Sequence, residues 1–197
     1  MDYSELPETP KNDSKKPDII LLSVVSGAVW VGLGVLLIYF FQDETFYEVV
    51  TRGSELWIQI TAGSIIGALF GWMGVLMMKQ PNLRAAVDEY AIMKQVKELK
   101  LTPIQVGIVS IIAGVTEEIL FRAAIQPLLG IWVTSILFIA IHGYIKFGSF
   151  PQIIFTLFTF FLSVLLGLLY IHYGVIAAMA AHALYDFIVL YKLSKES

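Results

Sequence analysis

The sequence contains no cysteine and has few charged residues. The lack of cysteine among 197 residues excludes disulfide bonds, thiolate nucleophiles and cysteine-ligated zinc. Charged residues make up 15% of the chain, whereas soluble domains carry about 25%. The formal net charge of −3 provides no excess of positive charge for a nucleic acid, so no nucleic-acid partner is predicted.

In place of charge the chain has long apolar runs. Residues 19–41 and 56–78 are two runs of 23 residues without a charged side chain, long enough to cross a hydrocarbon core of about 30 Å. Four further runs are bounded by breaks at Pro127, Gly130, Pro151 and Gly174, and they cover residues 102–126, 128–146, 151–171 and 175–193. The predicted fold is all-α: a polytopic membrane protein with a bundle of about six transmembrane helices and a polar site inside the membrane.

Three parts are predicted along the chain. Residues 1–18 form a polar cytosolic tail, residues 19–100 contain two transmembrane helices and an amphipathic connector, and residues 101–193 form the core that carries the motifs. Gly63, Gly67 and Gly71 recur at every fourth position, the pattern that lets membrane helices pack closely. In the connector, residues 79–100, one apolar stripe fits either a helix on the membrane surface or a solvated linker.

The positions of Lys and Arg predict the orientation. With the N-terminus inside, 11 of the 13 Lys and Arg residues lie in inner segments, and only Arg52 and Arg122 lie outside or within the membrane. Both termini are therefore predicted to be cytoplasmic. The short loops and small size suggest a bacterial plasma membrane.

Three ionisable residues interrupt an apolar run at Glu117, Glu118 and Arg122. Charged groups in a membrane segment are costly and usually face a bundle interior or a wet cavity. Glu118 and Arg122 are four residues apart, so they share a helix face and are predicted to pair. Glu117 points about 100° away from Glu118. One carboxylate is thus neutralised, and the other remains available for chemistry.

Two more polar groups lie on later spans. His142 follows Phe138 by one turn, and His182 and Asp186 are spaced to share a helix face. Both groups also have a purely structural explanation: His142 could form a hydrogen bond between helices, and His182 and Asp186 could simply pair with each other. The third histidine, His172, is predicted to lie at the membrane interface. Counting along straight helices puts His142 about 5–10 Å deeper than Glu117.

These residues resemble the motifs of the CAAX-protease and bacteriocin-processing family of membrane proteases, also called the Abi family. That family has Glu-Glu-x-x-x-Arg, Phe-x-x-x-His and His-x-x-x-Asn or Asp on successive membrane helices. The same order is found here in Glu117-Glu118 to Arg122, Phe138 to His142, and His182 to Asp186. The resemblance covers about residues 101–190.

The resemblance implies an intramembrane endopeptidase of the glutamate type without metal or other cofactor. Glu117 and His142 would activate a water molecule, and His182 and Asp186 would stabilise the oxyanion. Glu118, Arg122 and Phe138 would support them. The implied substrate is a membrane-associated peptide or protein, with or without an attached lipid.

One position departs from the commoner form of the family, and two other functions fit the same residues. Asp186 stands where many members have Asn, and an ionised Asp cannot donate a hydrogen bond to an oxyanion. A zinc-dependent protease could use the two histidines with Glu117 or Asp186 as ligands. A non-catalytic membrane protein, such as a bacteriocin-immunity factor or a proton-coupled carrier, could also need buried Glu and His.

Overall fold

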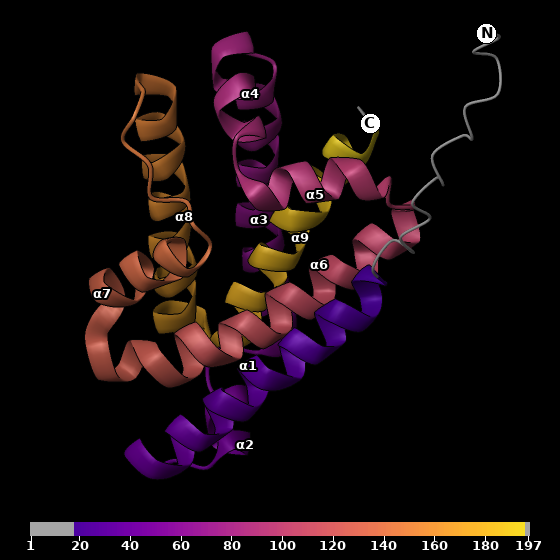
Figure 1. Ribbon diagram of the computed structural model, residues 1–197. Coiled ribbons are helices and arrows are strands. Elements are labelled where there is room, and N and C mark those ends of the chain that lie inside the picture. Colours follow the sequence, from indigo (N-terminus) through magenta and orange to yellow (C-terminus); the bar gives the residue numbers. More distant parts are fainter. Residues whose placement is uncertain (1–17, 196–197) are drawn as a thin grey trace, which may run out of the picture.

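The computed structural model describes residues 18–195, apart from the side chains of residues 91, 92 and 95, and these residues form helices only. The predicted all-α fold is confirmed, and most of the predicted polar tail (residues 1–17) lies outside the described residues. The elements are α1 (Ile19–Phe41), α2 (Phe46–Thr51), α3 (Leu56–Met78), α4 (Pro81–Asp88), α5 (Ala91–Leu99), α6 (Pro103–Glu118), the π-helix η1 (Ile119–Ile125), α7 (Gln126–Ile141), α8 (Phe150–Tyr173) and α9 (Val175–Lys195) (Figure 1).

Five helical stretches in the described chain are long and apolar enough to cross a membrane, where about six were predicted. They are α1, α3, α8, α9 and the continuous stretch Pro103–Ile141. This last stretch covers most of the predicted spans 102–126 and 128–146, and it turns sharply at Gly130, where φ is 76°. The two predicted spans are therefore two arms of one helical stretch.

Helices α3 and α9 pack closely along the predicted glycine stripe. A Cβ atom added at Gly63 would collide with the carbonyl oxygen of Ala177, and one added at Gly67 would collide with the backbone of Ala181. Only a residue without a side chain allows the two backbones to approach this closely. The stripe prediction is confirmed, and α3 holds α9 in place along its length.

Helix α1 lies beside α6 and η1, and both run obliquely to α3 and α8 in Figure 1. Gly27 packs against Thr116, and Gly34 packs against Ile119. Most of the large apolar side chains on the rest of α1 are exposed, which suits contact with lipid.

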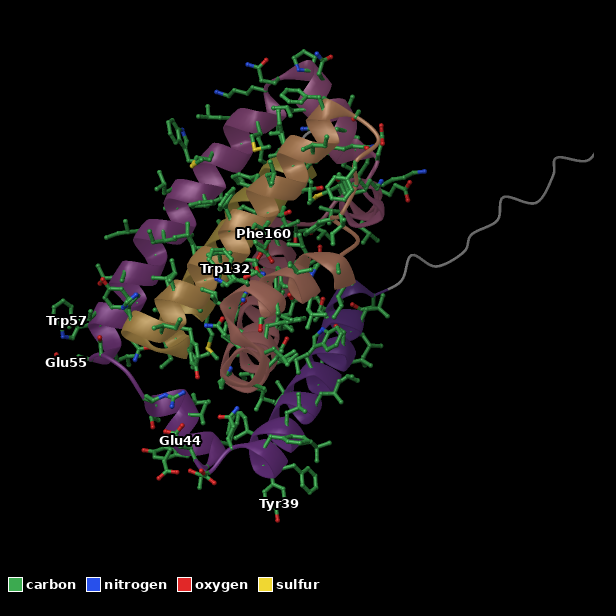
Figure 2. All side chains as sticks on the ribbon, turned by 90° about the vertical axis from the view of Figure 1, so that its left-hand side faces the viewer. Tyr39, Glu44, Glu55, Trp57, Trp132 and Phe160 are labelled. Atoms are coloured by element: carbon green, nitrogen blue, oxygen red, sulfur yellow. The ribbon has the colours of Figure 1, made fainter. Side chains whose placement is uncertain are left out.

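The two ends of the bundle differ in their side chains. Figure 2 shows Tyr39 and Glu44 at the bottom of the molecule, and Glu55 and Trp57 above them at the left edge, where α3 begins. Tyr39 and Trp57 are 77% and 65% exposed, as expected for aromatic residues at a membrane interface. In Figure 1, α4 and the C-terminal end of α9 lie toward the top, and α5 and the start of α1 lie below them on the right.

The connector consists of two short helices, α4 and α5, instead of one. Its apolar stripe, which includes Val87, Tyr90, Met93 and Val96, is buried in the main core cluster of the bundle. Lys146 donates a hydrogen bond from Nζ to a carbonyl oxygen of the connector at 3.1 Å, so the loop after α7 reaches the same end of the molecule.

Candidate active site

The predicted pair of Glu118 and Arg122 is present and fully buried. Arg122 Nε lies 2.9 Å from Glu118 Oε2, and neither side chain is exposed. Arg122 also donates from Nη2 to Ser163 Oγ on α8 at 2.9 Å. The pair begins where α6 changes into the π-helix η1. The π-helix is rare in proteins as a whole, but it often occurs at functional sites.

His182 binds the same glutamate from α9. Gly114 lies directly against Ala183, so α6 and α9 touch at this point. This contact brings His182 Nδ1 within 2.8 Å of Glu118 Oε1. Glu118 therefore accepts hydrogen bonds from two partners, whereas the sequence predicted only Arg122.

The predicted His182 and Asp186 pair is also present, at 3.5 Å between Nε2 and Oδ2. Both nitrogens of His182 thus face carboxylates, one on each side of the ring. Two carboxylates favour the doubly protonated imidazole, since an ionised carboxylate can only accept hydrogen bonds.

Glu117 and His142 come together across α6 and the end of α7. Glu117 Oε2 is 3.2 Å from His142 Nε2, so the depth difference obtained from straight helices was wrong. The turn at Gly130 sends the second arm of the helical stretch back past the first. His142 Nδ1 lies 2.7 Å from the carbonyl oxygen of Phe138. A carbonyl only accepts, so Nδ1 carries a hydrogen and Nε2 is the nitrogen that exchanges protons with Glu117 or with water.

The Phe138 ring joins the three motifs. Its centroid is 4.5 Å from that of His142 and 5.6 Å from that of His182, and Arg122 Cζ lies 5.2 Å from it. It packs edge-on against Phe121, which is fully buried on η1. A change in this ring would therefore disturb both histidines at once.

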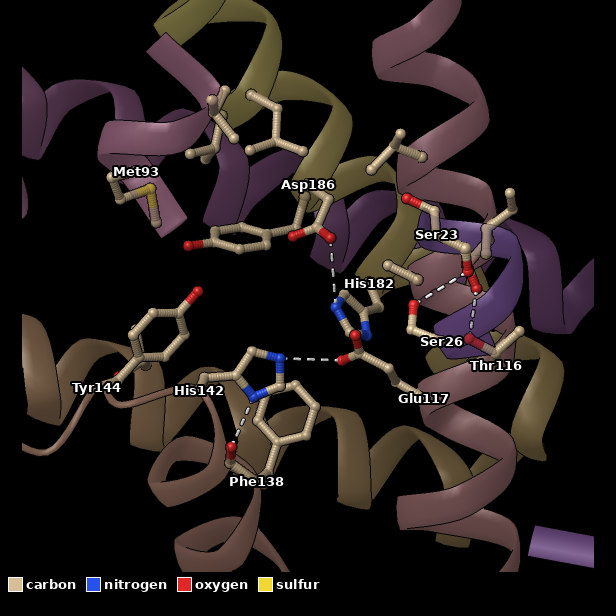
Figure 3. Close-up of a pocket in the computed structure, with 18 of the residues that line it drawn as sticks. Ser23, Ser26, Met93, Thr116, Glu117, Phe138, His142, Tyr144, His182 and Asp186 are labelled. Carbon is tan, nitrogen blue, oxygen red and sulfur yellow. Dashed lines mark hydrogen bonds and ion pairs between the residues drawn. The ribbon is translucent and has the colours of Figure 1, made fainter. Parts of the chain in front are cut away.

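One cavity of about 240 Å³ holds Glu117, His142, His182 and Asp186 on its wall. Figure 3 shows these four side chains facing one another across the space, with Tyr144 and Met93 on the opposite side. The remaining wall is mostly apolar and comes from α1, α5, α6, α7, α8, α9 and the link between α5 and α6 (Ile19, Ser23, Ser26, Trp30, Val96, Leu99, Leu101, Val109, Ile112, Ala113, Thr116, Phe138, Thr159, Leu162, Leu166, Tyr185, Val189 and Leu190). His172 is exposed near the end of α8 and does not line this cavity.

Several residues of the site were missed from the sequence. Ser163 belongs to a polar stripe with Thr156 and Thr159 at three- and four-residue steps on an apolar helix, and this spacing was an available signal. Ser23 and Ser26 form a similar stripe on α1.

No group of three His, Cys, Asp or Glu side chains in the described chain is arranged to hold a metal ion. The zinc alternative would require His142 to turn from Glu117, or His182 to turn from its two carboxylates.

Comparison with known protein families gives a match to the part of the chain that carries the motifs. Residues 100–188 match the family described as type II CAAX prenyl endopeptidase Rce1-like. No curated protein and no solved structure gave a significant match. The matched segment holds all three motifs, while α1 and α5, which also form the cavity wall, lie outside it.

Proposed function

We propose that this chain is an intramembrane endopeptidase of the glutamate type, as the match of residues 100–188 to the Rce1-like family of type II CAAX prenyl endopeptidases suggests. The observation that carries the proposal is the contact of Glu117 with His142 on the wall of a cavity within the helical bundle. Of the two adjacent glutamates, only Glu117 is available, because Glu118 already binds Arg122 and His182.

In the proposed reaction Glu117 removes a proton from a water molecule, and the water oxygen attacks the carbonyl carbon of the substrate. The carbonyl electron pair moves to its oxygen and forms the oxyanion. When this intermediate collapses, the C–N bond breaks and the proton held by Glu117 and His142 passes to the leaving nitrogen. The products are a new carboxylic acid and a new amine, so one water molecule is consumed for each bond cleaved.

Glu118 and Arg122 support this chemistry by holding His182. The Nδ1 hydrogen bond to Glu118 fixes the ring, and Asp186 lies near Nε2 on the cavity side. A positively charged His182 then stabilises the oxyanion electrostatically, and Asp186 maintains that charge. Asp186 does not contribute a hydrogen bond of its own while it is ionised.

The substrate we propose is a membrane-anchored peptide or protein, and a prenyl group is one suitable anchor. The cavity wall is mostly apolar, which suits an acyl or prenyl chain near the bond that is cleaved. The same wall runs from Glu117 to Ile19 on α1 and to Leu99 on α5, toward the end that carries the connector.

That end faces the cytoplasm in our proposal, as expected for a bacterial plasma-membrane protein with cytoplasmic termini. Lys79, Lys94, Lys97 and Lys100 lie in or beside the connector, and Lys146 contacts it. Positive residues concentrate on the cytoplasmic side of membrane proteins. A substrate would then reach Glu117 from the cytoplasmic side.

The proposal is tested with purified protein in liposomes and a library of membrane-anchored peptides that includes prenylated tetrapeptides. Products are identified by mass spectrometry, with Glu117→Ala as the control. New peptide ends with the wild-type protein and none with the variant support the function. Equal products from both proteins would contradict the glutamate-type assignment to Glu117. No products from either protein would count against the peptidase function and favour an immunity or carrier role.

A further inference from the structure

In the proposed reaction His182 stabilises the oxyanion by its charge, but the residues of the three motifs leave no unoccupied hydrogen-bond donor for it. Asp186 replaces the amide found in many relatives, and an ionised carboxylate has no hydrogen to donate. His182 uses Nδ1 for Glu118 and has Asp186 near Nε2. Oxyanion holes commonly contain more than one donor, so another group on the cavity wall is expected to contribute.

Three hydroxyl groups on the wall, from α6 and α1, are already engaged. Thr116 donates to the carbonyl oxygen of Ile112 at 2.8 Å, within α6. On α1, Ser23 donates to Ile19 at 2.8 Å, and Ser26 donates to Ser23 at 3.1 Å. These three hydroxyl oxygens can still accept hydrogen bonds, but their hydrogens point to their own helices.

Tyr144 is held against His142 by the chain that follows α7. Gly143 has a φ of 68°, a backbone conformation that glycine adopts without strain. The turn at this glycine folds the Tyr144 ring back onto His142, with ring centroids 5.3 Å apart and planes 25° from parallel. The backbone of Tyr144 is fixed at both ends, because its N–H donates to Ile139 at 2.9 Å and its carbonyl accepts from Thr156 at 2.6 Å.

The hydroxyl of Tyr144 points into the cavity. Figure 3 shows it directed into the open space between His142 and Asp186, with Glu117 on the far side of His142. It makes no hydrogen bond with any other group in the described part of the chain. Burial, with further contributions from nearby carboxylates, raises the pKa of Tyr144 well above its ordinary value. The hydroxyl therefore keeps its hydrogen at neutral pH.

We propose that Tyr144 is a further catalytic residue, whose hydroxyl donates a hydrogen bond to the scissile carbonyl oxygen as negative charge develops there. This inference rests on the proposed endopeptidase function. The stacking on His142 links the donor to the base, so that both keep their positions relative to the same carbonyl group. Tyr144 thereby compensates for the carboxylate at Asp186.

The test compares Tyr144→Phe with Tyr185→Phe. Tyr185 also lines the cavity, but its ring packs on Phe158 and not on His142. The Phe variant keeps the ring stacked on His142 and removes only the hydroxyl. Both variants and the wild type are reconstituted in liposomes, and kcat and KM are measured with a farnesylated peptide that ends in a CAAX tetrapeptide.

Tyr144→Phe is expected to lower kcat on the order of 10²-fold, the loss found when one oxyanion donor is removed, with little change in KM. Tyr185→Phe should lose much less. Thermal unfolding of both variants should match the wild type, because neither removes a hydrogen bond. A wild-type kcat in Tyr144→Phe, or an equal loss in Tyr185→Phe, would overturn the assignment to Tyr144. If the wild type cleaves no more than Glu117→Gln, the proposed function itself fails, and the role of Tyr144 fails with it.

Discussion

Replacing Gly114 by Ala tests the contact that assembles the site. A Cβ atom at position 114 would lie 2.7 Å from the backbone nitrogen of Ala183, 2.8 Å from its Cβ and 2.9 Å from its Cα. Two of these three atoms belong to the backbone, so α6 and α9 must separate to accept the methyl group. Overpacking of this kind costs about 1–3 kcal/mol.

Gly107→Ala provides the matched control on the same helix. The nearest atom to an added Cβ there is Cε2 of Phe187 at 3.9 Å, which is an ordinary contact. Glycine within a helix is less stable than alanine by about 0.5–1 kcal/mol, so this variant should be neutral or slightly stabilised.

The assay is thermal unfolding in detergent, followed by peptide cleavage. A change of 1 kcal/mol shifts the unfolding temperature by about 2–4 °C in a chain of this size, so Gly114→Ala should unfold about 2–12 °C below the wild type. Its turnover should fall on the order of 10²-fold, because the separation moves Glu117 relative to His182. Ala183→Gly removes one of the three close atoms and should restore part of both losses. Equal unfolding temperatures and turnover for Gly114→Ala and Gly107→Ala would refute the reasoning.

Three further predictions concern the charged groups and the metal. Glu118→Gln leaves Arg122 buried without its counter-charge, so the free energy of unfolding should fall by about 3–5 kcal/mol. The loss of activity, expressed as a free energy of activation, should be no larger than this loss of stability. An unchanged unfolding temperature would contradict the prediction. Asp186→Ala should cost as much turnover as His182→Ala with little further loss in the double variant, while Asp186→Asn should remain active because an amide can bond the imidazole and donate to the oxyanion. An Asn variant without activity beside an active Glu variant would show that the charge is required. Because the family resemblance implies metal-free catalysis, activity should survive prolonged chelation, with no stoichiometric zinc by elemental analysis, and activity lost on chelation and restored by zinc would indicate a metalloprotease.

The ionisable pairs whose two members lie on one helix could be predicted from the sequence. Glu118 with Arg122 and His182 with Asp186 follow from four-residue spacing, because a helix fixes which side chains are neighbours. The packing of α3 on α9 followed in the same way from the glycine stripe.

Contacts between helices could not be derived in this way. The bond from His182 to Glu118 depends on the approach of α6 to α9 at Gly114, and a single glycine has no spacing pattern that would predict it. The contact of Glu117 with His142 depends on the turn at Gly130. Counting residues along straight helices assumed that this turn separates two independent spans, and so it placed the two groups at different depths.

The contribution of helices outside the motif segment to the cavity wall could not be predicted from the sequence either. Residues of α1 and α5 line the cavity, although these helices carry no motif and lie outside the family match. Their apolar side chains have the same composition as residues that face lipid. Only the positions of the helices in the bundle distinguish the two roles.

The most direct test of the central claim is the turnover of Glu117→Gln in liposomes with the farnesylated CAAX peptide. Gln has nearly the same shape as Glu but cannot take a proton from water at neutral pH. We expect the variant to insert, to unfold at the wild-type temperature, and to lose at least about 10²-fold in kcat, the lower end of what a general base contributes. Wild-type turnover by a folded Glu117→Gln protein would contradict the assignment of Glu117 as the base.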